Sequence, residues 1–95
     1  MATVGVTFGD AAQRGEASIF TGNPGTSEVL TSSASSASTT ATTDKGQFVR
    51  IAPLGNIHAI FGNTAATSTG YVIASGSELV LYDANGGNKV SVIDA

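Results

Sequence analysis

Short runs of alternating apolar and polar residues, separated by residues that favour turns, extend along most of the chain. Residues 3–8 alternate apolar with polar or small side chains, and in residues 47–52 Val49 and Ile51 lie on one side of an extended backbone. Further runs occupy residues 57–61, 71–74, 78–82 and 89–93. A period of two residues is typical of strands with one buried face. The pattern therefore predicts an all-β fold, a small antiparallel β-sandwich or β-barrel of about seven or eight short strands.

The segments between these runs carry turn signals. Gly22-Asn23-Pro24-Gly25 predicts a turn between a strand at residues 17–21 and another at residues 27–31. The sequence Asp-Ala-Asn-Gly-Gly-Asn at residues 83–88 predicts a hairpin loop. Helix signals are weak, because residues 10–17 (DAAQRGEA) favour at most one helical turn and Gly15 interrupts it.

Residues 31–43 consist only of Ser, Thr and Ala. A flexible linker and a strand with a small-residue face both agree with this composition. We favour the strand, since Thr is a good strand former and small side chains allow close approach of a second sheet. Its register would be weakly specified by its own sequence, and the choice between strand and flexible segment stays open.

The length of 95 residues predicts a single β domain over residues 1–95, with residues 1–16 as an extended arm. Apolar residues make up 41% of the chain. Fourteen of these residues are Ala and 25 have bulky side chains, so the core is small. A core of this size supplies only about 3–5 kcal/mol of net stability. The chain has no cysteine, which excludes disulfides and thiolate metal sites. Association with other subunits is the remaining way to stabilise such a domain, and we expect a homo-oligomer.

Charge and hydropathy narrow the class of partner. The four cationic residues (Arg14, Lys45, Arg50 and Lys89) are scattered singly, so no basic stripe is present and we expect no nucleic-acid partner. The longest bulky apolar run is only a few residues, and we expect no membrane span. The first residues lack the charged and apolar regions of a signal peptide, which favours synthesis and retention in a cytoplasm.

Catalysis and metal binding require several reactive side chains close together in the fold, and the sequence contains few candidates. His58 is the one histidine, and no serine stands in a nucleophile-elbow context, so a hydrogen-bonded structural or interface histidine is the favoured interpretation. Asp83, Asn85 and Asn88 resemble the spacing of a calcium loop but lack its glycine and terminal glutamate. We expect no enzymatic activity, no cofactor and no metal site.

The aromatic residues allow one alternative. The sequence has four Phe and two Tyr, and in a core this small they are typical packing residues. A sugar-binding platform, as in small carbohydrate-binding modules, would instead leave Tyr71 or Tyr82 exposed.

The second half of the chain resembles small virion proteins of tailed bacteriophages. The pattern is a strand ending in Phe61-Gly62, a Thr/Ala/Ser loop over residues 64–69, the sequence Gly70-Tyr71-Val72-Ile73, a tight turn at Gly76, and a strand that begins with Glu78-Leu79. The preceding strand, Phe48-Val49-Arg50-Ile51, also fits the pattern. The resemblance covers about half of the chain, and the amino-terminal half, which contains the Ser/Thr/Ala segment at residues 31–43, departs from it.

The resemblance implies a virion protein on the capsid surface, most often a capsid decoration (cement) protein that binds the major capsid protein as a trimer and stabilises the shell. A neck, tail or fibre-attachment protein is the structural alternative. We expect the contacts to be made by the amino-terminal segment, which would add a strand to a neighbouring sheet edge, and by the loop at residues 62–69. The expected contact residues are Thr3, Val4, Val6, Phe8, Asn63, Thr64 and Thr67.

Overall fold

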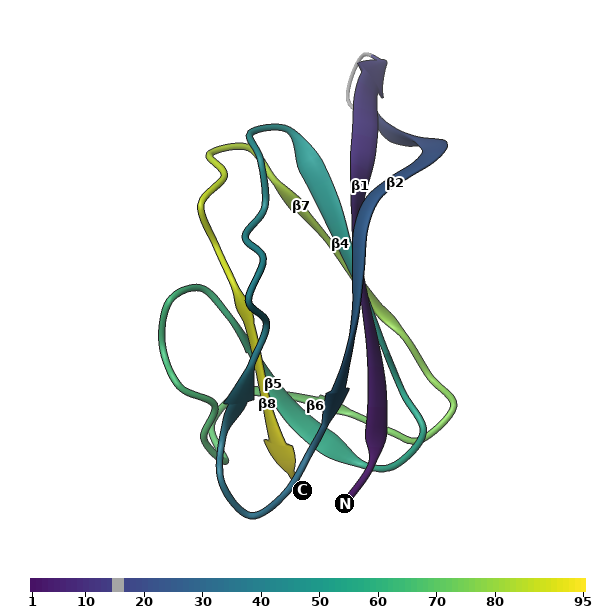
Figure 1. Cartoon of the computed structure of the whole chain (residues 1–95). Coiled ribbons are helices and arrows are strands. Elements are labelled where there is room, and N and C mark those ends of the chain that lie inside the picture. Colours follow the sequence, from purple (N-terminus) through teal and green to yellow (C-terminus); the bar gives the residue numbers. More distant parts are fainter. Residues whose placement is uncertain (15–16) are drawn as a thin grey trace.

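The chain folds into eight β-strands joined by loops and turns (Figure 1). The computed structural model describes residues 1–14 and 17–95, and for residues 10–14 and 17–26 it describes only the backbone. In chain order the strands are β1 (Thr3–Arg14), β2 (Ala17–Thr31), β3 (Ala37–Ser38), β4 (Gln47–Pro53), β5 (Ile57–Phe61), β6 (Tyr71–Ile73), β7 (Leu79–Asp83) and β8 (Val90–Asp94). No helix occurs among the described residues.

The strands form two antiparallel sheets of four strands each. Sheet A has the order β2–β1–β4–β7, and sheet B has the order β3–β8–β5–β6. The predicted all-β fold is therefore confirmed. Of the two predicted architectures the sandwich fits, because the strands form two separate sheets rather than one closed barrel. Most connections cross from one sheet to the other, which holds the two layers together (Figure 1).

The core lies between the inner faces of the two sheets. Side chains of a strand alternate between its faces, so every second residue points inward. On β4 these inward residues are Val49 and Ile51, which the sequence pattern places on the same side of the strand, and both are fully buried. The remaining buried apolar residues of the core are Ala2, Val4, Val6, Phe8, Ile57, Ala59, Ile73, Val90 and Val92.

The amino-terminal strand β1 is a central strand of sheet A. It pairs with β2 along one edge and, from Val4 to Asp10, with β4 along the other. Its inward residues Val4, Val6 and Phe8 are buried in the core. A strand with neighbours on both edges has no edge left for another subunit. The interpretation of residues 1–16 as an arm is thus wrong for residues 4–10, and these three residues are core residues rather than contact residues. Residues 11–14 pair with β2 alone, and residues 15–16 lie outside the described residues.

The Gly22–Gly25 signal produces a bulge instead of a turn. Strand β2 runs without a break from Ala17 to Thr31, and its register against β1 shifts twice, between Phe8 and Gly9 and between Gly9 and Ala11. Extra residues of β2 are accommodated there, and the strand swings away from β1 before it returns (Figure 1). Proline is tolerated because β2 is an edge strand. The weak helix signal at residues 10–17 also fails, since residues 10–14 belong to β1.

The Ser/Thr/Ala segment is mostly irregular but is held by hydrogen bonds. It contains the short strand β3, which pairs with β8, and the hydroxyl residues Ser32, Thr39 and Thr43 are buried. Thr39 donates its N–H to the Val90 carbonyl and accepts the Val90 N–H at its side-chain oxygen. The favoured single strand is therefore reduced to two residues, because the segment crosses from sheet A to sheet B and back.

Residues 83–88 form a crossing between sheets. Strand β7 pairs with β4 in sheet A, whereas β8 pairs with β3 and β5 in sheet B, so the predicted hairpin is not formed. Gly86 and Gly87 adopt φ angles of 79° and 80°, which favour glycine. A Cβ atom on Gly86 would also lie 2.6 Å from the Lys45 backbone nitrogen. The two glycines let this crossing turn tightly against residues 44–45.

The position of Phe8 gives a test of the corrected role of β1. Phe8→Ala removes a fully buried ring from the centre of the core and should lower the free energy of unfolding by about 3–5 kcal/mol. Chemical denaturation followed by circular dichroism measures this change. Val29→Ala, at a side chain that is 72% exposed, is the control and should change stability by less than about 0.5 kcal/mol. Equal effects of the two substitutions would contradict the central position of β1.

Candidate interaction surface

The edge strand β6 carries two bulky apolar side chains that the fold leaves exposed. Strand β6 pairs with β5 along one edge, and no strand among the described residues covers its other edge. Tyr71 is 54% exposed and Val72 is 71% exposed. Val72 lies opposite His58 on the outer face of sheet B, and Tyr71 lies opposite the buried Ala59 on the inner face. Both faces of this edge therefore present apolar surface to solvent.

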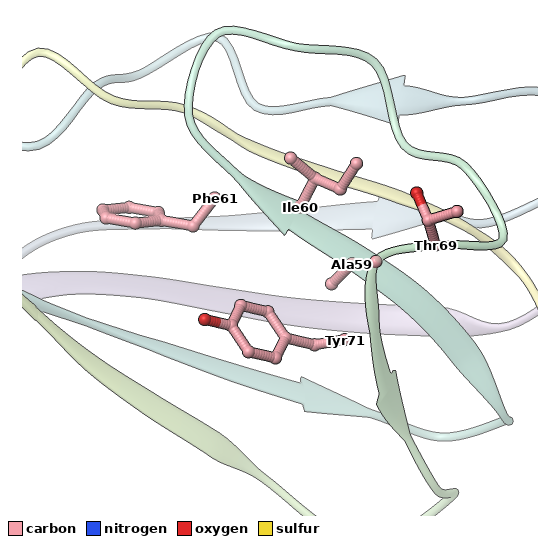
Figure 2. Close-up of a pocket in the computed structure, with 6 residues that line it drawn as sticks. Ala59, Ile60, Phe61, Thr69 and Tyr71 are labelled. Carbon is pink, nitrogen blue, oxygen red and sulfur yellow. The ribbon is translucent and has the colours of Figure 1, made fainter.

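A cleft opens beside Tyr71. It has a volume of about 260 Å³ and its lining includes Ala59, Phe61 and Thr69. Figure 2 shows Tyr71 and Ile60 on opposite sides of β5, with Thr69 near the returning chain. The loop returns to the sheet at Gly70, just before β6, and this position needs a glycine because a Cβ atom there would lie 2.5 Å from the Ala59 carbonyl oxygen. The cleft is thus an opening at the side of the core, bounded by aromatic and aliphatic groups.

The loop at residues 62–70 joins β5 to β6 and carries three of the predicted contact residues. Asn63, Thr64 and Thr67 are all exposed. The Asn63 amide donates to the Gly87 carbonyl, and the hydroxyls of Thr67 and Thr69 lie 2.7 Å apart. These hydrogen bonds hold the loop in place while its polar side chains face solvent. A contact role for the three residues stays a prediction.

Thr3 is the remaining predicted contact residue, and it is exposed. It lies in β1 opposite Thr31 of β2, and its carbonyl accepts the Leu54 N–H. Its side chain is on the solvent side of sheet A, so it is separated from Val4 by the sheet itself. The structure therefore does not bring the predicted amino-terminal residues and the loop residues together into one site.

The sequence contained a signal for the β6 edge that we did not use. Tyr71, Val72 and Ile73 are three bulky apolar residues in a row on a short strand. Because neighbouring side chains of a strand point to opposite faces, at least one of the three must lie on the outer face. Strand order, which the sequence did not show, decides that this outer face belongs to an edge strand.

His58 lies on the outer face of sheet B, between Val72 of β6 and Ile93 of β8. The side chain is half-buried, and its Nδ1 is buried without a hydrogen-bond partner within the described part of the chain. The expected hydrogen bond at this atom is not formed. Among the described side chains, those of residues 1–9 and 27–95, no three His, Asp or Glu residues form a group that could hold a metal ion.

Asp83, the first residue of the calcium-like spacing, is buried and surrounded by donors. Its carboxylate accepts hydrogen bonds from the Thr43 hydroxyl, the Asn88 amide and the backbone N–H groups of Asn85 and Gly86. Desolvation by burial raises the pKa of Asp83, but these bonds outweigh it and lower the pKa from 3.8 to about 2. Through these hydrogen bonds the Asp83 carboxylate anchors the crossing at residues 83–88 to Thr43.

This anchor predicts a dependence of stability on pH. Because the pKa of Asp83 is lower in the folded protein than in the unfolded chain, its contribution is present above about pH 4 and is lost as the pH falls to about 2. Asp83→Asn should lower the free energy of unfolding near neutral pH by about 1–3 kcal/mol and should weaken its decrease over that interval. Urea denaturation at a series of pH values measures both effects.

The matched control is Asp44→Asn, which removes the same charge from an exposed residue. It should change stability by less than about 0.5 kcal/mol. Identical pH profiles for Asp83→Asn and the unsubstituted protein would contradict the anchoring role of Asp83.

Comparisons with known proteins identify no relative of the chain. No protein-family model matches it, and neither the search of curated proteins nor the search of solved structures finds a match. Among the described residues, no helix is long and apolar enough to span a membrane. The function is therefore argued from the residues of the chain itself, above all from the β6 edge.

Proposed function

We propose that this chain is a structural protein of a virus particle, a capsid decoration protein that binds the outer shell and stabilises it. The observation that carries the proposal is the β6 edge, where Tyr71 and Val72 expose apolar surface beside an ordered polar loop. The resemblance of the second half of the chain to virion proteins of tailed bacteriophages supports the same role, and the β6 edge lies within that half.

The β6 edge offers a partner two kinds of contact. Its unpaired backbone groups can extend the sheet by one strand from another chain. Burial of an exposed apolar side chain contributes about 1.5–3 kcal/mol, so Tyr71 and Val72 together can anchor such a contact. Asn63, Thr64 and Thr67, on the loop that precedes β6, would supply the polar contacts around it. The partner in this proposal is the major capsid protein.

Self-association would strengthen the attachment. A trimer presents three copies of the β6 edge to the shell at once, and linked contacts raise the overall affinity well above that of one contact. We therefore propose a homotrimer as the form that docks on the virion surface. Light scattering coupled to size-exclusion chromatography measures the oligomeric state directly, and a monomer would favour a single adaptor subunit.

One observation favours a second candidate function. Tyr71 is exposed and borders the cleft together with Phe61, and exposed aromatic rings are what a carbohydrate-binding module uses to stack on sugars. A glycan array probed with the purified chain separates this function from the first. Saturable sugar binding that Tyr71→Ala abolishes would replace the capsid proposal.

A double substitution tests the proposed contact. Tyr71→Ser with Val72→Ser removes both exposed apolar side chains and should weaken binding to shells of the major capsid protein by at least about tenfold. Co-sedimentation of the purified chain with these shells measures the bound fraction. Val29→Ser changes an equally exposed residue on β2, the edge strand of the other sheet, and should bind as the unsubstituted chain does.

The copy number in purified particles separates decoration from a neck or tail position. Quantitative mass spectrometry should find the chain at a stoichiometry close to that of the shell subunit. A copy number equal to that of a single portal or tail ring would contradict decoration and favour the neck or tail role.

If the variant with Tyr71→Ser and Val72→Ser binds shells as the unsubstituted chain does, the β6 edge is excluded as the contact surface.

A further inference from the structure

A second pocket, with several polar side chains in its lining, lies on the outer face of sheet B. It has a volume of about 190 Å³ and lies between β3, β8 and the loop that follows β5. Gly62 and Ala65 form part of its lining, and the polar side chains that line it are Ser38, Asn63, Thr64, Lys89 and Ser91. Each of them carries a hydrogen-bond donor, Lys89 carries a positive charge, and no carboxylate lines the pocket. A pocket with this lining is complementary to a group that accepts hydrogen bonds and is negatively charged.

Two serine hydroxyls leave one proton without an acceptor in the pocket. The Oγ atoms of Ser38 and Ser91 lie 2.7 Å apart, and either can be the donor. Each hydroxyl has one proton, so their mutual hydrogen bond uses one of two. Neither hydroxyl makes another hydrogen bond within the described part of the chain. Ser91 is buried and Ser38 is exposed, so with Ser91 as the donor the spare proton lies on Ser38, at the open side of the pocket.

Lys89 supplies the charge and is not neutralised by a close partner. The carboxylate that interacts with it is Glu28, whose oxygens already accept the N–H groups of Thr40 and Ala41 at 3.0 and 2.8 Å. No ion pair joins Lys89 to a carboxylate among the described residues. Desolvation raises the pKa of Glu28, but its backbone hydrogen bonds, the Thr40 side chain and the charge of Lys89 outweigh it and lower the pKa. Lys89 thus lines the pocket without forming an ion pair within the described part of the chain.

The walls of the pocket are fixed by hydrogen bonds that do not involve the free donors. The Gly62 N–H donates to the Lys89 carbonyl at 2.8 Å, and the Asn63 amide donates to the Gly87 carbonyl at 3.1 Å. The Ala66 N–H donates to the Ser36 hydroxyl at 2.8 Å. These bonds join the loop to both neighbouring segments, so the donors are held in position before a ligand arrives.

We propose that this pocket binds a small oxyanion, the acceptor group that phosphate, sulfate and carboxylates share. Lys89 pairs with the negative charge, the spare hydroxyl proton of the Ser38–Ser91 pair donates to one oxygen, and Thr64 donates to another. Charge-assisted hydrogen bonds of this kind are short and strong. The inference is independent of the proposed role in a capsid, since it depends only on the donors of the pocket.

The test is a titration of the ¹⁵N-labelled full chain, followed by amide chemical shifts. Sodium phosphate, sodium sulfate and sodium acetate are added separately, with sodium chloride at the same ionic strength as the reference. We expect saturable shifts at residues 62–65 and 89–91 with at least one of the three oxyanions. Preference for phosphate or sulfate indicates a free anion, whereas preference for acetate indicates a carboxylate presented by a protein partner.

Lys89→Met removes the charge and keeps the length of the side chain, and it should weaken the saturable binding by about tenfold or more. Lys45→Met removes the same charge from an exposed residue that does not line the pocket, and it should leave binding within about twofold. Circular dichroism shows whether each variant is folded. Shifts that chloride reproduces, or equal losses in the two variants, would overturn the proposal.

Discussion

The pairing of β1 along both of its edges is the constraint on which the rest of the structure depends. Strands β2 and β4 each hydrogen-bond to β1, and β7 joins sheet A only through β4. The inward side chains of β1 also fill the centre of the core, opposite the apolar residues of sheet B. Loss of β1 would therefore separate β2 from the rest of sheet A and empty the core in one step. The segment that we expected to be an arm is the least dispensable part of the fold.

Buried hydroxyl groups perform a second structural task. The segment between β2 and β4 crosses between the sheets twice, and its small side chains leave room for the backbone to approach the sandwich. Ser32 accepts the Ala2 N–H and donates to Asp94, and Thr43 donates to Asp83. Hydrogen bonds to charged groups stabilise more than those between neutral groups. A composition that resembles a linker is thereby fixed at several points.

Much of the fold follows from the sequence, because alternation is a local property. The strands at residues 47–53 and 57–61 agree with the pattern, and Val49 and Ile51, which the alternation places on one side, are both buried. Strand order is a non-local property and is not encoded in any short window. For this reason the local pattern predicts a hairpin at residues 83–88 and an arm at residues 1–16, although neither prediction agrees with the strand order. The turn predicted at Gly22–Gly25 is wrong for a related reason, since the same residue types suit both a turn and a bulge.

The candidate surfaces were less accessible to sequence analysis than the strands. The loop residues Asn63 and Thr64, which we expect to make contacts, are exposed, and their contact role stays a prediction. The exposure of Tyr71 and Val72 depends on β6 being an edge strand, which only the sheet order reveals. In the pocket on sheet B, the pairing of β3 with β8 brings Ser38 next to Lys89 and Ser91, which lie far from it in the sequence. No spacing motif connects these residues.

The strands β1 and β2 continue beyond the part of β1 that pairs with β4, and their far end projects past the sandwich (Figure 1). Force applied to this end along the strand direction would pass directly into the centre of sheet A. Hydrogen bonds between antiparallel strands are perpendicular to the strands, so such a load acts on all of those between β1 and β4 together. Strands loaded in this shear geometry resist separation better than strands that are peeled apart one bond at a time. A load applied at the projection would therefore meet the pairing of β1 with β4 in its more resistant direction.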